Sequence, residues 1–359
     1  MSMNTYLNPT QLAADRTAVM LNINAKKVTS RVVDRVAQVV PHTDLFLSRS
    51  FDDARKQVET VVARGYGRVL AGGGDGTLVT LINLIDRTIR RCLDRGQQVP
   101  FPEMGMLRLG TGNAVASVLG AGSLIPDVKR HLRGEDQLRV QLDMLRVGDQ
   151  DTLCPFAGIG YDGEILGDYN WVKAHAQNPV AKALMQTSLG YLAGLFLRTL
   201  PRKLAEFGRN LPEIEVRARG RAFRVDHQAN DALVRADDEL LYRGPVGFAG
   251  AGTVPVYGFN FRVFPFAGRV PGLMHLRVTD VSALTAVANL GGLWRGTWRH
   301  PQLHDFLVEG VEIVGDRPLP YQLGGDAAGA RANLDLRVAE QPLAMAALAP
   351  PRLALPAAA

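Results

Sequence analysis

The feature that constrains this chain most is a run of glycines directly after a short apolar segment. Residues 68–71 read RVLA, as in a buried strand, and GGGDGT follows at 72–77, ahead of a helical apolar pattern over 78–95. Glycines lack a Cβ, so backbone there can approach a bulky anion closely, and the following helix N-terminus favours negative charge. The run lacks the Lys of a Walker A loop and is no six-residue dinucleotide fingerprint. It therefore predicts a strand–loop–helix unit that binds phosphate.

Strand and helix patterns alternate through the first 138 residues. Strands are expected over residues 18–23, 44–48, 68–71 and 105–109, and helices over 28–40, 51–64, 78–95 and from about Asn113. This alternation predicts a parallel sheet with helices on both faces, which binds ligands at the carboxyl ends of its strands. A second glycine loop, GTGN at 110–113, follows the fourth strand, so the two loops predict a nucleotide cradle. The alternative for the second loop is a helix start with Asn113 as N-cap.

The character of the sequence changes after Leu138. Short strand-like runs recur at 139–147, 153–159, 214–219, 222–225, 246–249, 259–263 and 273–278, with a helical insertion from about Glu164 to Glu206. They predict an antiparallel β-rich domain. We therefore expect an α/β domain at 1–138, a β-rich domain at 139–340, and a tail at 341–359 that either packs back on the first domain or frays; 359 residues fit about two domains.

Composition excludes several classes of protein. Two cysteines rule out a disulfide framework and a Cys-based zinc site, and no interleaved basic and aromatic pattern points to nucleic acid. Asp15 and Arg16 precede the first apolar run, which is unlike a signal peptide, and the stretch 183–197 is too short to span a bilayer. These features predict a cytoplasmic protein. The net charge of +6 is compatible with nucleotides or anionic lipids as partners.

Three further patterns suggest chemistry. Asp75 lies among expected phosphate contacts, where a carboxylate would coordinate Mg²⁺ or accept a proton from an attacking hydroxyl; the alternative is a helix cap. Residues 169–205 combine five basic residues with apolar and aromatic ones and no acid, which predicts contact with an anionic membrane surface or, alternatively, core packing. Trp294 and Trp298 are four apart and are expected to pack or to lie at an interface.

Three motifs together resemble the diacylglycerol kinase catalytic family. They are GGGDGT at 72–77, GTGN followed by Ala at 110–114, and GIGYDG at 158–163. That family includes bacterial lipid kinases and sphingosine kinases and is distantly similar to NAD kinases. The resemblance covers nearly the whole chain, and the order and spacing of the motifs favour the lipid branch. It implies transfer of the γ-phosphate of ATP, with Mg²⁺, to a hydroxyl of a membrane lipid, either diacylglycerol or a sphingoid long-chain base, by an enzyme peripherally bound to the membrane.

The resemblance also assigns residues. Asp162 and Gly160 would lie near the acceptor lipid, and Asp75 would serve in catalysis and metal binding. Asn22 matches the first residue of the family's Asn-Pro loop, although the proline is absent. The residues that would bind ATP are Asn22, Ser48, Gly73, Gly74, Asp75, Gly76, Thr77, Gly110, Thr111, Gly112 and Asn113.

Two segments depart from the family pattern. Where relatives carry Asp-Gly-Glu near the C-terminus, residues 322–329 hold only Asp326, which therefore inherits the role of catalytic base. Where relatives have an acidic turn around a structural Mg²⁺, residues 268–272 have no carboxylate, so this metal site is expected to be missing or replaced by the charge of Arg269. The alternatives are a soluble NAD kinase-like enzyme, which would want Asn-Glu where this chain has Asn113-Ala114, and an inactive nucleotide- or lipid-binding homologue. A homodimer is left open.

Overall fold

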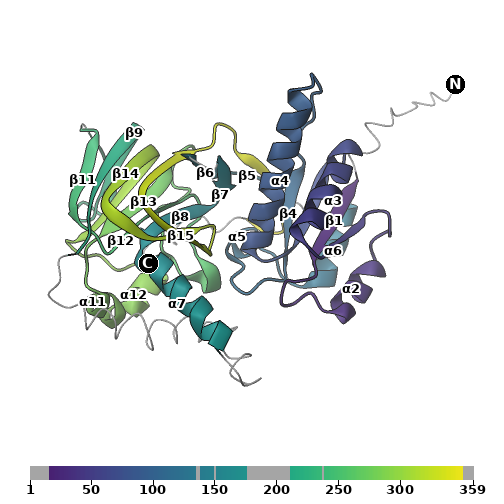
Figure 1. Cartoon of the computed structure of the whole chain (residues 1–359), viewed down its shortest axis with the longest axis horizontal. Helices are drawn as coiled ribbons and strands as arrows, with labels where there is room; N and C mark the ends of the chain where they lie inside the picture. Colours follow the sequence, from purple (N-terminus) through teal and green to yellow (C-terminus); the bar gives the residue numbers. More distant parts are fainter. Residues whose placement is uncertain (1–15, 135–137, 149–150, 176–210, 237, 351–359) are drawn as a thin grey trace. The chain divides into compact units, whose positions relative to one another are not determined.

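The chain divides into two compact units. The computed structural model describes residues 16–134, 138–148, 151–175, 211–236 and 238–350 (Figure 1). Unit 1 takes in the chain up to Leu142 and returns at Leu343, and unit 2 extends from Asp143 to Pro342. Among the described residues, no helix is long and apolar enough to cross a membrane.

Unit 1 is an α/β domain around a six-stranded sheet, as the alternating patterns predict. The strand order is β2-β1-β3-β4-β16-β5, and all neighbouring pairs are parallel except β16 with β5. Its elements are β1 (Thr17–Asn22), α2 (Ser30–Ala37), β2 (Leu45–Ser48), α3 (Phe51–Ala63), β3 (Arg68–Gly73), α4 (Asp75–Leu93), β4 (Glu103–Arg108), α5 (Ala114–Val118), α6 (Leu124–Arg133), β5 (Leu138–Leu142) and β16 (Leu343–Ala347).

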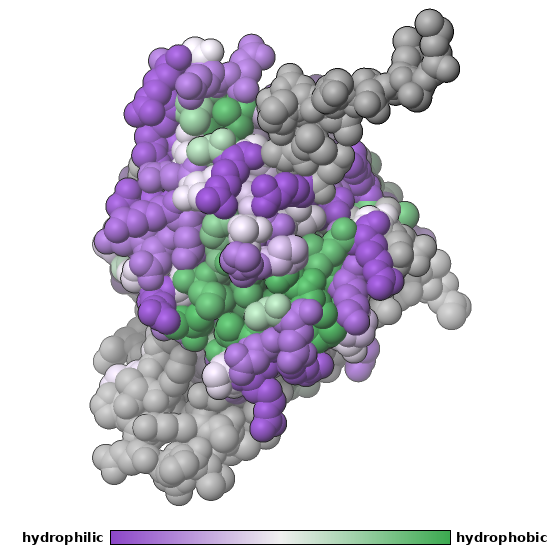
Figure 2. Space-filling view, turned by 90° about the vertical axis from the view of Figure 1, so that its right-hand side faces the viewer, coloured by the Kyte–Doolittle hydropathy of each residue, from purple (hydrophilic) through white to green (hydrophobic). Residues whose placement is uncertain are grey.

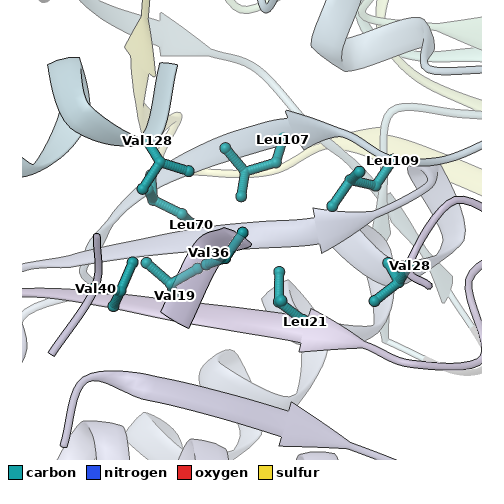
Figure 3. Packing of buried hydrophobic residues seen from close by; sticks show 9 residues of the cluster. All are labelled: Val19, Leu21, Val28, Val36, Val40, Leu70, Leu107, Leu109 and Val128. Carbon is teal, nitrogen blue, oxygen red and sulfur yellow. The ribbon is translucent and has the colours of Figure 1, made fainter. Parts of the chain in front are cut away.

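The core of unit 1 follows from the alternation of side chains along buried strands. One face of β1, β3 and β4 packs against α2 and α6, and α3 and α4, which contact β2 and β3, cover the other face. Val36 of α2 and Val128 of α6 are fully buried there. The cluster consists of Val19, Leu21, Val28, Val36, Val40, Leu70, Leu107, Leu109 and Val128 (Figure 3).

Hydrophobic residues at the margin of this core are only partly buried. Val32 and Val33 of α2 and Leu45 and Leu47 of β2 pack against the cluster without being covered completely. Figure 2 shows a hydrophobic area surrounded by polar residues on one face of the molecule. The start of helix α3 is fixed by a capping residue. Ser50 caps α3 by accepting the backbone N–H of Asp53 at 3.0 Å.

The C-terminal segment supplies a strand to the first unit. β16 lies between β4 and β5, and Met345 stands opposite both Met104 and Val140. Because β5 pairs with β16, residues 139–142 belong to unit 1, although the strand-like run at 139–147 predicts that they belong to the β-rich domain. The run over 139–147 is therefore two strands, β5 and β6, in different units.

Unit 2 is the antiparallel β-rich domain. Strands β8, β12, β13 and β14 form a closed ring of pairings, and β9 and β15 extend the sheet from β14. The elements are β6 (Leu145–Val147), β7 (Thr152–Cys154), β8 (Phe156–Gly160), α7 (Tyr161–His175), β9 (Glu213–Asp226), β10 (Ala232–Arg235), β11 (Leu240–Pro245), β12 (Phe248–Gly252), η3 (Gly258–Asn260), β13 (Met274–Thr279), α11 (Ala283–Ala288), α12 (Leu290–Arg295), β14 (Leu303–Leu323) and β15 (Asp326–Val338).

Local expectations for unit 2 differ from the structure in three places. The segment 259–263 is no strand, because Phe259 and Asn260 have φ values of 61° and 59° in a turn around η3. The two runs at 214–219 and 222–225 are one strand, β9, which continues through Gly220. The long β14–β15 hairpin was not expected. Of the helical insertion, α7 is described, and residues 176–210 lie outside the described residues.

We expect Met345→Ala to loosen unit 1, because the side chain is fully buried between strands far apart in sequence. A Met→Ala change in such a core costs about 2–5 kcal/mol. Amide hydrogen exchange should show faster exchange in β4 and β5 with little change in unit 2. Met345→Leu, which keeps the volume, is the matched control and should cost less than about 1.5 kcal/mol. Wild-type exchange in the alanine variant would contradict a structural role for β16.

Candidate functional site

The two glycine loops lie against each other at the carboxyl ends of β3 and β4. A Cβ built on Gly110 would overlap the Cα of Gly74 and lie 2.9 Å from its nitrogen. A Cβ on Gly73 would overlap the side chain of Thr77, and one on Gly72 that of Leu21. At Gly110, glycine is therefore required by close approach of backbone, whereas Gly72 and Gly73 are crowded by side chains.

Asp75 ties the two loops together. It opens α4, and its two carboxylate oxygens accept the backbone N–H groups of Ala114 and Val115 at 2.9 and 3.0 Å. These are the first amides of α5, so a negative charge on Asp75 also stabilises the N-terminus of that helix. The alternative, in which Asp75 caps the helix that follows its own turn, differs from this contact, because the N-cap of α4 is Gly74 and Asp75 binds amides of α5. The predicted roles of Asp75 in catalysis and metal binding stay predictions.

Asn113 closes the second loop on itself. Its side chain accepts the N–H of Gly110 at 2.9 Å and donates to the carbonyl of the same residue at 2.8 Å. Its backbone is left-handed, with φ 54°, and the residue is 2% exposed. Asn113 therefore shapes the loop from inside, while Thr111 and Gly112 remain partly exposed beside it.

The remaining predicted nucleotide contacts lie at neighbouring strand ends. Asn22, the last residue of β1, donates to the hydroxyl of Thr77 at 3.1 Å. Ser48 ends β2, and its hydroxyl donates to the carbonyl of Leu21 at 3.4 Å. No side chain caps the N-terminus of α4, whose N-cap is Gly74. The carboxyl edge of the sheet thus presents helix amides and hydroxyls, the groups that bind phosphate oxygens.

This edge offers no ready-made metal cage. In the part of the chain that the structure describes, no three His, Cys, Asp or Glu side chains gather closely enough to hold a metal ion. Both oxygens of Asp75 already accept amide hydrogens. The residues present therefore do not fit a Mg²⁺ held by protein side chains alone, and a Mg²⁺ bound to nucleotide phosphates would belong to the substrate.

In unit 2, the GIGYDG motif turns from β8 into α7 by close backbone contact. Gly160 has φ 97°, and a Cβ there would overlap the carbonyl oxygen of Gly247. A Cβ on Gly163 would lie 2.6 Å from the backbone of Pro320, and one on Gly158 would lie 2.7 Å from the carboxylate of Asp162. The glycines therefore position Asp162 in the first turn of α7.

A chain of hydrogen bonds surrounds Asp162. The Tyr257 hydroxyl donates to its carboxylate at 3.1 Å, and the buried Gln322 amide donates to the Tyr257 oxygen at 2.9 Å. Burial raises the pKa of Asp162 to about 7, although the hydrogen bonds from Gly163 and Tyr257 oppose the shift. Sequence reasoning missed Tyr257, for which no motif gave a signal, and Gln322, which begins the segment matched to the family's C-terminal motif.

Asp162 and Tyr257 border an apolar cavity of about 180 Å³ within unit 2. Its polar lining is confined to a few groups, among them Asp162, Tyr257, Arg277 and Thr279. The apolar lining comes from α7, β12, the residues after η3, the helices α11 and α12 with their flanks, and the start of β14. It consists of Ile165, Phe248, Phe261, Val263, Val281, Ala283, Ala286, Val287, Leu290, Leu293, Trp298 and Leu303. Such a lining suits a hydrocarbon chain, with a titratable carboxyl at its wall.

The two departing segments have defined places in unit 2. Asp326 is exposed at the tight β14–β15 turn, and the N–H of its neighbour Gly325 donates to the Gln322 side chain at 3.0 Å. The turn is thereby connected to Asp162 through Gln322 and Tyr257. In the 268–272 loop, the N–H of Gly272 donates to Asp143 at 2.8 Å. Neither contact tests the role of Asp326 as base, which stays a prediction.

We expect the carboxyl of Asp162 to titrate near pH 7, as seen by carboxyl-detected NMR with Asp162→Asn as the assignment control. Between the ordinary pKa of 3.8 and about 7, only the folded state keeps the proton. The free energy of unfolding should therefore fall as the pH rises through this range, and the asparagine variant should lack this dependence. A pKa near 4 would contradict the buried, apolar setting.

Gly110→Ala should disturb the loops without unfolding unit 1, because the new methyl group meets the backbone of Gly74. Overpacking of this kind costs about 1–3 kcal/mol, so MgATP binding measured by calorimetry should weaken at least about tenfold. Gly122→Ala is the matched control, since its nearest neighbour atom would be 3.9 Å away. If the two variants bind MgATP with equal affinity, the contact between the loops is not needed for nucleotide binding.

Comparisons with known proteins agree with the motifs. Residues 19–145 match the family model of the diacylglycerol kinase catalytic domain. None of the curated proteins compared matches the chain. A structure of a diacylglycerol kinase from Bacillus anthracis superposes with a TM-score of 0.60 at 11% identity, covering 92% of this chain and 96% of that one.

Two further structures from the same bacterium, both of candidate diacylglycerol kinases, are similar in the same way. One has a TM-score of 0.62 at 12% identity over 92% of this chain and 94% of its own. The other has a TM-score of 0.61 at 13% identity over 92% and 96%. At these identities the likeness establishes the fold, and the matched region contains both glycine loops. Residues 19–145 thus match the diacylglycerol kinase catalytic domain, in a chain that has the fold of the bacterial proteins.

Proposed function

We propose that this protein is an ATP-dependent lipid kinase that transfers the γ-phosphate of ATP to a hydroxyl of a membrane lipid, diacylglycerol or a sphingoid long-chain base. The observation that carries the proposal is the apolar cavity of unit 2 with Asp162 at its wall. The kinase-type domain over 19–145 supports the nucleotide half of the reaction, and the cavity supports a hydrocarbon acceptor.

The chain's own residues have distinct tasks in this proposal. The amides of the glycine loops and the N-terminus of α4 bind the phosphates of MgATP and spread their charge. The cavity holds an alkyl chain, and the Asp162 carboxylate accepts a hydrogen bond from the polar group of the lipid. The acceptor oxygen attacks the γ-phosphorus, the bond to the β-phosphate breaks, ADP leaves, and the hydroxyl proton goes to a base, for which Asp326 stays the prediction.

The cavity favours this function over the two alternatives. An NAD kinase accepts a polar, charged dinucleotide, which gains little from a hydrocarbon-lined cavity. An inactive homologue would bind lipid and nucleotide without transfer. The carboxyl of Asp162, with its pKa raised by burial to about 7, is the kind of group found at reactive sites and thus favours an enzyme.

The test is phosphate transfer from labelled MgATP by the purified full chain to diacylglycerol, sphingosine, ceramide and NAD, with each lipid dispersed in detergent micelles. We expect a phosphorylated lipid and no phosphorylated NAD. Filling the cavity with Ala286→Leu should raise the KM for lipid at least about tenfold and leave the KM for ATP unchanged. The matched control is Ala288→Leu, on the exposed side of the same helix. Phosphorylation of NAD alone, or of none of the four acceptors, would overturn the proposal.

A further inference from the structure

The segment from Ser282 to Trp298, which we call the α11–α12 strap, is apolar in composition yet contains no buried residue in either of its helices. One side of it forms cavity wall through Val287, Leu290 and Leu293. Leu284 does not line the cavity and is 46% exposed. The strap is therefore a single layer with hydrocarbon lining on one side and solvent on the other.

The one charged residue of the strap is basic. Residues 281–304 contain no Asp or Glu, and Arg295 is exposed near the end of α12. Trp294 stacks on Phe261 with ring centroids 5.2 Å apart and remains partly exposed. Leucine, tryptophan and arginine together are the composition of segments that lie in the interface of an anionic bilayer.

The strap is fixed to the unit 2 sheet at its ends. Where the strap begins, the N–H of Val281 donates to the hydroxyl of Thr279, the last residue of β13, at 3.1 Å. Just beyond the strap, Arg299 forms two hydrogen bonds to Asp231, at 2.7 and 3.0 Å. Asp231 also contacts His227, which is within 3.1 Å of the fully buried Asp305. A surface held in this way keeps its apolar side chains in place before a partner arrives, which lowers the entropic cost of docking.

We propose that the outer face of the α11–α12 strap docks on an anionic lipid bilayer and that the acceptor lipid enters the cavity beside it. The choice of a bilayer follows from charge complementarity and from the cavity directly behind the strap, because the ligand that fits a hydrocarbon-lined cavity resides in a membrane. The entry of the lipid, and the argument from the cavity, rest on the proposed function. The docking also stands without them, on the exposed Leu284 in a segment whose one charged residue, Arg295, is basic.

The first test measures partition of the full chain onto vesicles of phosphatidylcholine with phosphatidylglycerol, by flotation. Leu284→Glu combined with Arg295→Glu should lower partition at least about tenfold. The matched control is Leu93→Glu, which alters a leucine of α4 that is 51% exposed, and should partition like the wild type. Phosphorylation of lipid in detergent micelles should be the same in all variants, which shows that they are folded. Unchanged partition of the double variant would overturn the proposal.

The second test locates the contact. The chain has three tryptophans, so Trp171→Phe with Trp298→Phe leaves Trp294 as the reporter. On the same vesicles its emission should shift to the blue and be quenched by brominated lipid. Partition without quenching would overturn the proposal and assign the contact to another surface, such as residues 169–205. If light scattering shows that Leu284→Glu changes the oligomeric state while its partition onto vesicles is unchanged, the proposal is overturned in favour of self-association. Quenching without any lipid phosphorylation would support the docking surface while the proposed function fails.

Discussion

Two backbone segments of unit 1 lie so close together that Gly110 has no room for a side chain, and the arrangement of the predicted nucleotide site depends on this contact. Gly74 and Gly110 meet at the ends of adjacent parallel strands. Asp75 then holds α5 to the first loop by two amide hydrogen bonds, and Asn113 shapes the second loop from inside. Asp75 and Asn113, which the motifs predict as ligand contacts, thus also hold the loops in shape.

Much of unit 1 could be predicted from sequence, because its signals are local. Alternating apolar strands and amphipathic helices determine a parallel sheet, and glycine runs at strand ends determine where a ligand binds. The place of β16 could not be settled in this way, since its pairing with β4 and β5 joins segments about 200 residues apart or more. Position along the chain likewise gave no sign that β5 and β6 belong to different units.

In unit 2, less of the structure could be predicted from the sequence. Its motif glycines were recognisable, but Tyr257 and Gln322 reach Asp162 through hydrogen bonds between residues far apart in sequence. The cavity is also a product of tertiary structure, because α7, β12, β13 and the α11–α12 strap each contribute part of its wall. A carboxyl that looks like one acid among many in the sequence becomes, by burial, a group with a pKa of about 7.

The central claim is that the cavity of unit 2 holds the hydrocarbon chain of the acceptor lipid, and photolabelling tests it most directly. A diacylglycerol or sphingosine with a photoreactive group in its alkyl chain would be bound to the full chain, irradiated and located by peptide mass spectrometry. We predict labels on cavity-lining residues such as Phe248, Val287 and Leu290, with competition by the unlabelled lipid. Labels confined to other surfaces, or labels that the unlabelled lipid does not displace, would contradict the account.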